Sequence, residues 1–318
     1  MKAPFTLFLA LALNTVSVSA DAPVLSPPLQ LRRGEPGFAT LEPLAAGSDA
    51  AGYTLVLTYV NGSTSPRYPG FTAPAPVVDS RHAVAALFLF SAPVDAALGA
   101  ASMVAYGPDG KTIAEARILV TERSFSQEDL RLDEVLAGIR VDPDTRKTEQ
   151  ALRYQAVLAS VDPTAVFLDA DFMKPVETER RTSAFGLRRR YLYPGGAEEL
   201  TTHNGIDYGC PTGSPVIAAG AGRVVMAEDR IVTGKTVILE HLPGAFTIYM
   251  HLDTMAVQVG AVIVRGAPVG TVGKTGLATG PHLHWEFRIR GVACDPEALI
   301  GLDKTPSIRR IVPAIEGG

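Results

Sequence analysis

The chain has few cysteines, almost no excess charge and no long apolar segment. Its 318 residues include two cysteines, Cys210 and Cys294, which excludes a disulfide-rich scaffold and a separate cysteine-ligated zinc site. Their spacing leaves open whether they form one disulfide or remain free thiols. A formal net charge of -4 gives no overall attraction to nucleic acid or to an anionic membrane. No segment reaches the roughly 20 apolar residues needed to cross a bilayer, so we expect no membrane span.

The composition is typical of a turn-rich, mainly β protein. Glycine (30) and proline (24) are plentiful, and apolar residues make up 47% of the chain against 19% charged residues. This balance differs from that of a helical bundle or a disordered chain. A chain of this length is expected to form about two domains, each with a core of its own.

The first 20 residues are expected to be a secretory signal peptide. Lys2 supplies a positive charge, residues 5–13 form a short apolar core, and residues 18–20 offer small side chains for cleavage before Asp21. No cysteine lies near this cleavage site, so we expect no lipid on the mature N-terminus. The protein should therefore be exported to a periplasm or to the outside of the cell.

Residues 21–122 are predicted to form a β-sandwich, with the length and turn spacing of an immunoglobulin-like domain. Residues 53–60 are rich in β-branched and aromatic side chains and end at an Asn-Gly pair, which is a strong hairpin signal. Residues 84–90 form a continuous apolar run. Residues 103–106 and 113–120 flank a Gly-Pro-Asp-Gly turn and predict a second hairpin.

Residues 123–171 are predicted to be a helical linker between two β domains. Ser126 to Asp129 is typical of a helix start, and apolar residues follow it at helical spacing. After an Asp-Pro-Asp break, a second helix is expected from Thr145 to Ser160, with Leu152 and Val157 facing inward. This helical pair would act either as a structural spacer or as a cover over the active site.

Histidine is concentrated in the second half of the chain. Five of the six histidines lie between His203 and Glu286. His203 and Asp207 are four residues apart around a glycine that disfavours helix, so an extended segment would point both side chains to one face. His282 and His284, two residues apart, share a strand face for the same reason. Two such strands side by side would bring three histidines and a carboxylate together.

This set of side chains is suited to a catalytic zinc site. Such sites take three protein ligands from His, Asp or Glu and leave a fourth position to water. His203, Asp207 and one member of the pair His282 and His284 would supply the ligands. Zinc lowers the pKa of water from about 15.7 toward about 7 and polarises a carbonyl group. The other member of the pair and His251 would then supply the base, the acid and the oxyanion donor that amide hydrolysis requires.

The order of these motifs resembles the lysostaphin-type (LytM-like) zinc endopeptidases, which cut peptidoglycan peptides. The similarity covers about residues 172–299, which is under half of the chain, and every position of the catalytic pattern is present. It is carried by these motifs: His203-x-x-x-Asp207, Tyr249-Met250-His251-Leu252 and Gly280-Pro281-His282-Leu283-His284-Trp285-Glu286, with Ser183-Ala184-Phe185-Gly186 and Gly273-Lys274-Thr275-Gly276 as flanking segments.

The resemblance implies a role for each of these residues. His203, Asp207 and His284 would bind one Zn²⁺ ion. His251 and His282 would be the catalytic pair that orients or deprotonates water and stabilises the oxyanion. The implied fold is an antiparallel β-sheet peptidase domain with a groove over the sheet.

We assign the peptidase domain to residues 172–305 and a C-terminal tail to residues 306–318. The implied activity is zinc-dependent hydrolysis of peptide bonds in peptidoglycan cross-links by an exported enzyme associated with the cell wall. The pattern does not indicate which bond is cut or the oligomeric state. It also leaves open whether the N-terminal domain binds the wall, binds a partner or blocks the groove.

Tyr249 and Arg188 are candidate substrate contacts. Tyr249 would either donate a hydrogen bond to the transition state or pack in the core. Arg188, which lies in a run of arginines, would either receive a carboxylate of the peptide stem or lie on a solvated basic face. His241 precedes a Leu-Pro-Gly turn and is expected to be solvated at a hairpin end.

Three other functions match parts of the pattern. A non-catalytic LytM-like module that binds cell wall or activates a wall hydrolase is the main alternative, but such modules usually lose ligands, and all five expected positions are intact here. A swivelling carrier domain would display a modified lysine at a hairpin tip, and Lys274 lacks the flanking pattern expected for one. A zinc amidase or carboxypeptidase of another fold would need a different order of motifs.

Overall fold

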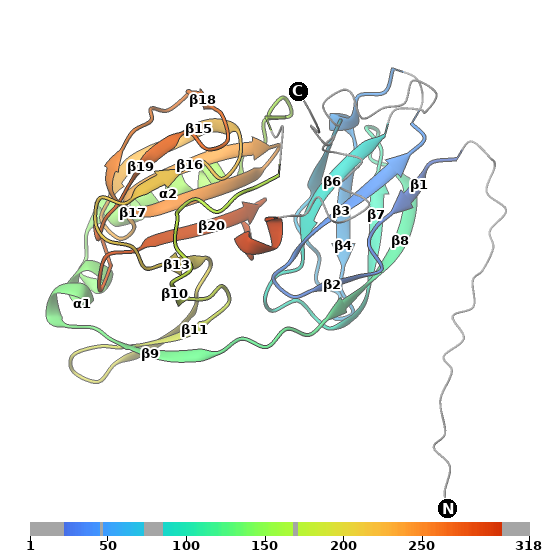
Figure 1. The fold of residues 1–318 in the computed structure, drawn as a ribbon. Helices are drawn as coiled ribbons and strands as arrows, with labels where there is room; N and C mark the ends of the chain where they lie inside the picture. The colour runs from blue at the N-terminus through green and yellow to red at the C-terminus, as the bar shows by residue number, and fades with distance from the viewer. Residues whose placement is uncertain (1–21, 45–46, 73–84, 168–170, 301–318) are drawn as a thin grey trace, which may run out of the picture.

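The computed structural model describes residues 22–44, 47–72, 85–167 and 171–300. Over these residues the chain is mainly β, as the composition predicts, with an N-terminal and a C-terminal β region side by side (Figure 1). One strand and two α-helices occupy the segment between them. The signal peptide predicted at residues 1–20 and the tail predicted at 306–318 lie outside the described residues, so both stay predictions.

The N-terminal region is an eight-stranded arrangement in the order β1-β3-β6-β5-β4-β7-β8-β2. All neighbours are antiparallel except β2 and β8, which pair in parallel. β7 and β8 form the second hairpin expected from the sequence. The immunoglobulin-like class stays a prediction. The strands are β1 (Val24–Ser26), β2 (Gln30–Arg32), β3 (Pro36–Glu42), β4 (Thr54–Thr58), β5 (Tyr68–Phe71), β6 (Ala86–Ser91), β7 (Gly99–Tyr106) and β8 (Thr112–Thr121).

The C-terminal region is built on a ten-stranded antiparallel sheet. Its main path is β10-β13-β20-β17-β16-β15-β18, with β14 and β19 paired at one side and β21 paired to β20. The strands are β10 (Arg181–Ser183), β13 (Ile206–Tyr208), β14 (Pro215–Ile217), β15 (Gly222–Arg230), β16 (Gly234–Leu242), β17 (Ala245–Met255), β18 (Val262–Ile263), β19 (Pro268–Val272), β20 (Leu283–Ile289) and β21 (Val292–Cys294).

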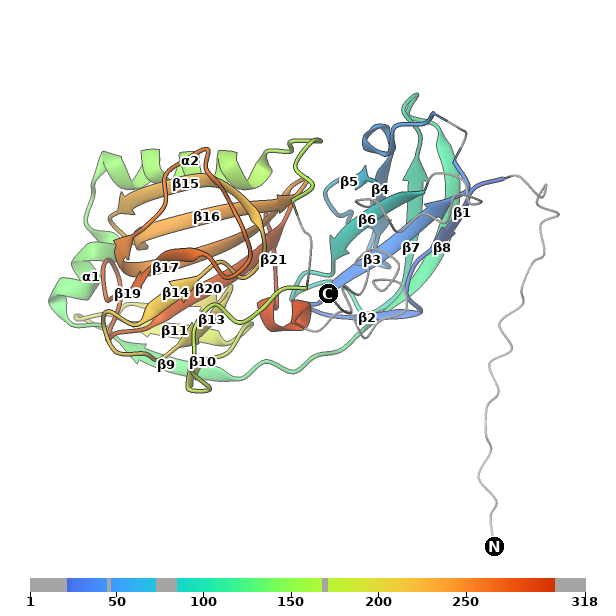
Figure 2. The same ribbon diagram turned by 45° about the horizontal axis from the view of Figure 1, so that its top comes forward.

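The two faces of this sheet have different partners. Along β20, Leu283, Trp285 and Phe287 point into the main hydrophobic core, as strand alternation requires. The opposite face carries a second apolar cluster, in which Leu158 of helix α2 (Thr145–Ala159) packs on β15, β16 and β17. Figure 2 shows α2 lying along this face. The helix therefore covers part of the face that also carries His284.

The linker differs from the prediction at its start. Residues Ser126 to Asp129 were expected to begin a helix, and this is wrong: Gln127–Arg131 is strand β9. β9 pairs in parallel with β11 (Arg188–Leu192), which pairs with β12 (Glu198–Thr202) to complete a three-stranded sheet. Non-local pairing here overrides the local capping signal. Helix α1 (Glu134–Val141) begins later, after Asp133 caps it by accepting a hydrogen bond from the Leu136 amide.

The two β regions are packed against each other rather than tethered. The backbone amide of Asp295 donates to the carbonyl of Gly34, and the Asp295 carboxylate accepts from Arg123 at 2.5 Å. Gly34 has a φ of +76°, and a Cβ there would lie 2.5 Å from the Phe185 ring. Both regions contribute to one continuous buried cluster. The N-terminal region therefore has a fixed position beside β20 and β21.

His241 is not solvated, and the expectation that it would be is wrong. Its side chain is fully buried at the end of β16, with Nδ1 2.7 Å from the Ala221 carbonyl and Nε2 2.7 Å from the Thr247 hydroxyl. Burial lowers the pKa of His241 to about 4, so the ring is neutral. Cys210 and Cys294 are also buried, and both are free thiols.

Helix α2 offers a direct test of its packing face. Leu152 was expected to face inward, but its side chain is 61% exposed, whereas Leu158 is 4% exposed. Leu158→Ala should lower the free energy of unfolding by about 2 to 5 kcal/mol because it leaves a cavity, whereas Leu152→Ala should change it by less than about 0.5 kcal/mol. Urea unfolding of both variants measures this, and equal losses would contradict the packing described.

His241 should make stability depend on pH. Its pKa is about 4 in the folded protein and ordinarily 6.5, so the unfolded chain takes up a proton first as the pH falls. The neutral, buried His241 therefore contributes fully to the free energy of unfolding above pH 6.5. This contribution, on the order of 3 kcal/mol, is lost as the pH falls from 6.5 to about 4. Unfolding free energies of the protein and of His241→Gln should therefore converge over this range. A constant difference between them would contradict the prediction.

Candidate metal centre

His203, Asp207 and His284 converge on one point of the sheet. Asp207 in β13 lies directly opposite His284 in β20, so the two side chains share a face. His203 Nε2 lies 3.0 Å from both Asp207 Oδ1 and His284 Nδ1, and these last two atoms are 2.7 Å apart. In the described ranges this is the one group of His, Cys, Asp or Glu arranged to hold a metal ion.

The turn before β13 brings His203 to this point. Gly205 passes so close to β20 that a Cβ on it would lie 2.4 Å from the Trp285 carbonyl oxygen. The chain from His203 to Asp207 can therefore lie flat against β20 only because residue 205 has no side chain. The glycine that argued against a helix in the sequence thus has a packing role.

Hydrogen bonds select which nitrogen of each ligand histidine faces the metal position. His203 Nδ1 lies 2.8 Å from the Ala184 carbonyl, which can only accept, so Nδ1 carries the proton and Nε2 is free. His284 Nε2 lies 3.0 Å from Glu286 Oε1, which leaves Nδ1 as the metal-facing atom. Such partners orient ligand rings at metal sites.

The electrostatics of the site favour a cation. Burial alone would raise the pKa of Asp207, but hydrogen bonds with His203 and His284 hold it well below its ordinary value. Burial lowers the pKa of His284, but Asp207 and Glu286 on either side raise it to about 9. Two imidazole nitrogens and one carboxylate oxygen are a donor set that suits zinc. The residues present therefore fit the metal that the sequence predicts.

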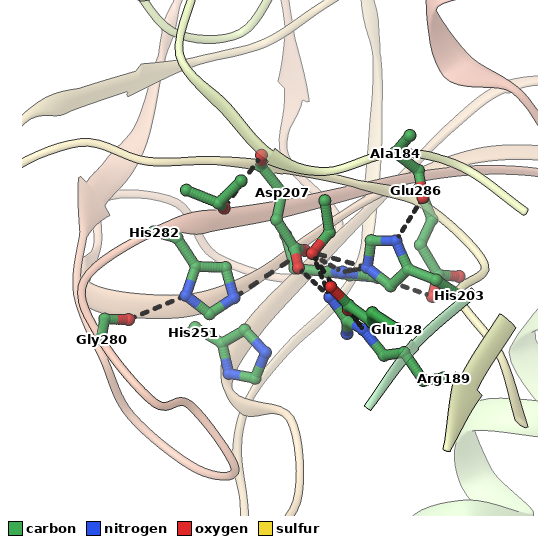
Figure 3. Close-up of polar contacts among 12 residues, drawn as sticks. Glu128, Ala184, Arg189, His203, Asp207, His251, Gly280, His282 and Glu286 are labelled. Atoms are coloured by element: carbon green, nitrogen blue, oxygen red, sulfur yellow. Dashed lines mark hydrogen bonds and ion pairs between the residues drawn. The ribbon is translucent and has the colours of Figure 1, made fainter. Parts of the chain in front are cut away.

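His251 and His282 flank the ligands and are not part of the three-atom group. Their rings are 4.8 Å apart between centroids, and His282 Nε2 lies 3.8 Å from Asp207 Oδ1. Figure 3 shows Asp207 with His282 on one side and His203 on the other, and His251 beside His282. His251 Nδ1 lies 2.8 Å from the Thr275 carbonyl and His282 Nδ1 2.8 Å from the Gly280 carbonyl. Each histidine thus keeps an unprotonated Nε2.

His251 reaches the site through a β-bulge. Between Tyr249 and Leu252 strand β17 advances three residues while β16 advances two, so β17 contains one extra residue. Tyr249 and Leu252 both point into the main core, and His251, at a φ of +61°, turns to the metal face. Without the bulge, strict alternation would send His251 into the core with Tyr249. A left-handed backbone at a histidine is strained and is held here by the surrounding sheet.

Arg189 and Glu286 form an outer shell around the ligands, a role that the sequence analysis assigned to neither: Arg189 was considered only within the arginine run as a contact for substrate carboxylates. Arg189 Nη2 donates to Asp207 Oδ2 at 2.7 Å, and Arg288 Nε donates to Glu286 Oε2 at 2.6 Å. Glu286 could have been found from its spacing, because it lies two residues after His284 on the same strand face. No spacing in the sequence indicated that Arg189 contacts Asp207, because its strand β11 belongs to a different sheet from β13.

The two candidate substrate contacts, Tyr249 and Arg188, do not line the cavities beside the metal position. Tyr249 is fully buried, and its hydroxyl accepts from the Ala219 amide at 2.8 Å, so it packs in the core. Arg188 is exposed at the start of β11 and lines none of the cavities beside the metal position. Strand alternation instead directs its neighbour Arg189 to the site. Tyr249 thus takes the packing alternative, whereas substrate contact by Arg188 stays a prediction.

Cavities border the metal position on two sides. The larger, about 470 Å³, lies toward α2, and the smaller, about 210 Å³, lies toward β9. The side chains that line both are Arg189, Tyr191, His251, Leu277 and His284. A chain-like substrate lying across the metal position would extend into both spaces.

Comparison with known proteins identifies the domain that carries this site. Residues 201–296 match the model of Peptidase family M23. The chain contains an M23 peptidase domain. This confirms the predicted LytM-like family for that part of the chain. The match includes all three metal-facing residues and both flanking histidines.

Two curated relatives of the M23 domain are named peptidoglycan DD-endopeptidases. ShyA of Vibrio cholerae is 39% identical over 118 residues, which cover 37% of this chain and 27% of ShyA. ShyC of the same organism is 35% identical over 125 residues, which cover 39% of this chain and 28% of ShyC. The chain therefore spans little more than a quarter of the length of these relatives.

A solved structure shares the fold over most of the chain. The crystal structure of a Pseudomonas aeruginosa protein assigned to peptidase M23 matches with a TM-score of 0.53 and 23% identity, covering 83% of this chain and 93% of that one. The M23 domain and its N-terminal partner thus share their fold with that protein. Among the helices described here, none is long and apolar enough to cross a membrane.

Removing a metal-facing side chain should abolish metal binding. His203→Ala and Asp207→Ala should each reduce bound zinc from about one ion per chain to nearly none, because each removes one of three ligands. His282→Ala should keep its zinc, since His282 lies outside the ligand group. Elemental analysis of the purified variants measures this. Full zinc content and activity in His203→Ala would refute the ligand assignment.

Proposed function

We propose that this protein is an exported zinc-dependent endopeptidase that hydrolyses amide bonds in peptidoglycan cross-links. The observation that carries the proposal is the joint placement of a three-atom ligand group and two histidines with free Nε2 atoms beside it. A site that only binds would need no such pair. The names of the ShyA and ShyC relatives, both peptidoglycan DD-endopeptidases, support the same substrate class.

The ligand group would hold one zinc ion through His203 Nε2, Asp207 Oδ1 and His284 Nδ1. Bound there, zinc supplies Lewis acidity, which lowers the pKa of water toward about 7 and polarises the scissile carbonyl. The protein contributes the ligand geometry and the outer shell. Asp207 is kept ionised by its neighbours, and His203 is held by the Ala184 carbonyl.

His251 and His282 would move the protons. Each donates Nδ1–H to a backbone carbonyl and presents Nε2 as an acceptor. One Nε2 accepts a proton from the attacking water and delivers it to the leaving amine nitrogen as the C–N bond breaks. The other Nε2 would take up a proton from solvent, donate it in a hydrogen bond to the oxyanion of the tetrahedral intermediate, and release it to solvent after the carbonyl re-forms. The left-handed backbone of His251 fixes its ring before the substrate arrives.

The main alternative is a non-catalytic M23 module that binds cell wall or activates a hydrolase. Such a module has no use for a complete ligand group with a flanking catalytic pair. Here all five side chains are present and are oriented by hydrogen bonds. The catalytic proposal therefore accounts for more of the structure.

The decisive experiment is mass spectrometry of purified peptidoglycan after incubation with the mature protein, with and without a chelator. The expected result is conversion of cross-linked muropeptides to uncross-linked ones, which stops when the chelator removes zinc and identifies the bond that is cut. Absence of conversion by protein that holds one zinc ion would refute the endopeptidase and favour the activator.

His251→Ala should lower turnover more than substrate binding. Loss of a group that transfers protons typically costs about 10²- to 10⁴-fold in rate, so kcat should fall by that factor while KM changes little. Leu152→Ala, an exposed change on α2, serves as the control and should keep the original kcat. Unchanged turnover in His251→Ala would remove this residue from the mechanism.

A further inference from the structure

We infer that Glu128 and Tyr154 are positioning residues of the metal site, although both precede the M23 match at residues 201–296. Neither side chain reaches the metal-facing atoms. Glu128 acts through Arg189 on Asp207, and Tyr154 acts through Glu286 on His284. The linker between the β regions would thus complete the metal centre from two sides.

The first chain of contacts begins on β9. Glu128 Oε1 accepts from Arg189 Nε at 2.7 Å, and Arg189 Nη2 donates to Asp207 Oδ2 at 2.7 Å. The side chains of Arg189 and Asp207 are 15% and 5% exposed, so the pair is largely shielded from solvent. Arg189 holds the Asp207 oxygen that does not face the metal. Glu128 fixes Arg189 in turn, because the parallel register places Glu128 directly beside it.

The second chain of contacts begins on α2. The Tyr154 hydroxyl donates to Glu286 Oε2 at 3.2 Å, and Glu286 Oε1 accepts from His284 Nε2 at 3.0 Å. Gln150 holds the helix in this position on the sheet. Its backbone carbonyl accepts a hydrogen bond from Arg230, and its side-chain carbonyl accepts one from the Ile231 amide. Tyr154 therefore reaches Glu286 from a helix that is anchored to β15.

These contacts argue against the interpretation of the linker as a structural spacer alone. A spacer would contact only the outside of the domains it joins. β9 and α2 instead each place one polar side chain against the outer shell of a different metal ligand. Partners in this position fix ligand orientation, and their loss typically weakens metal binding by about 10- to 100-fold.

The protein contains a matched control for Glu128. Its neighbour Asp129 pairs with Arg190 at 2.6 Å, across the same two strands and in the same register. The Asp129–Arg190 pair points to the other side of the strands and is exposed, at 42% and 39%. Glu128→Gln and Asp129→Asn therefore remove equivalent charges from β9, but only Glu128→Gln affects the side that faces Asp207.

The test is the zinc affinity of the full chain, measured by competition with a chromophoric chelator. Glu128→Gln and Tyr154→Phe should each weaken zinc binding by about 10-fold or more, whereas Asp129→Asn should stay within about twofold of the original protein. Thermal unfolding of the zinc-free proteins should be nearly the same for Glu128→Gln and Asp129→Asn. This comparison separates positioning of the metal ligand from general stabilisation of β9.

Two outcomes would overturn the proposal. One is an unchanged zinc affinity in both Glu128→Gln and Tyr154→Phe. The other is an equal loss in Asp129→Asn, which would show that strand pairing alone is responsible. The inference rests on the metal site of the proposed function but not on its substrate. Zinc affinities that follow the expected pattern in a protein that cleaves no peptidoglycan would support the positioning roles and refute the peptidase.

Discussion

The pairing of β13 with β20 is the constraint on which the metal centre depends. It sets Asp207 opposite His284 on one face and Tyr208 opposite Leu283 on the other. Because strand side chains alternate, a shift of one residue would bury Asp207 in the core and expose Tyr208. The register is held by the large apolar side chains on the core face, above all Trp285, which is fully buried. Hydrophobic packing on one face of the sheet thus fixes the positions of Asp207 and His284 on the other face.

Two buried carboxylates make the site costly to assemble. Asp207 and Glu286 are 3% and 4% exposed, and a buried charge without a partner would destabilise the fold by several kcal/mol. Each is paired with an arginine, Arg189 or Arg288, at hydrogen-bonding distance. Each arginine binds one oxygen of its carboxylate. The other oxygen of Asp207 belongs to the ligand group, and the other oxygen of Glu286 accepts a hydrogen bond from His284. This pairing of charges explains how two carboxylates can be buried beside the four histidines of the site.

The linker contributes to both the packing and the electrostatics of the site. Helix α2 covers the apolar part of the metal-bearing face through Leu158 and reaches Glu286 through Tyr154. Strand β9 extends the sheet that carries Arg189 and brings Glu128 beside it. The M23 match begins at residue 201, after both elements. Even so, β9 and α2 each contact a residue that holds a ligand of the candidate metal site. Residues 127–159 therefore pack with the M23 domain around the candidate metal site.

Local sequence patterns predicted the mainly β fold and the side chains that gather at the site. They could do so because strand alternation depends on neighbours in the chain: His203 with Asp207, and His282 with His284, share faces by even spacing alone. Helical spacing likewise predicted helix α2 almost to its ends. The M23 family was inferred from different evidence, the order of the motifs from His203 to Glu286, which resembles that of LytM-like peptidases.

The pairing of strands could not be predicted from local sequence patterns. Strand spacing left open whether His282 or His284 joins the ligand group, and only the family resemblance favoured His284; the register of β13 on β20 now places His284 opposite Asp207. His251 turns to the site through a bulge in β17 that no local sequence pattern indicated. Contacts between distant segments also explain three other features that local patterns missed: the strand at Gln127–Arg131, the burial of His241 and the hydrogen bond from Arg189 to Asp207. Each depends on a contact between segments far apart in the chain, where the free energy of pairing and burial outweighs local preference.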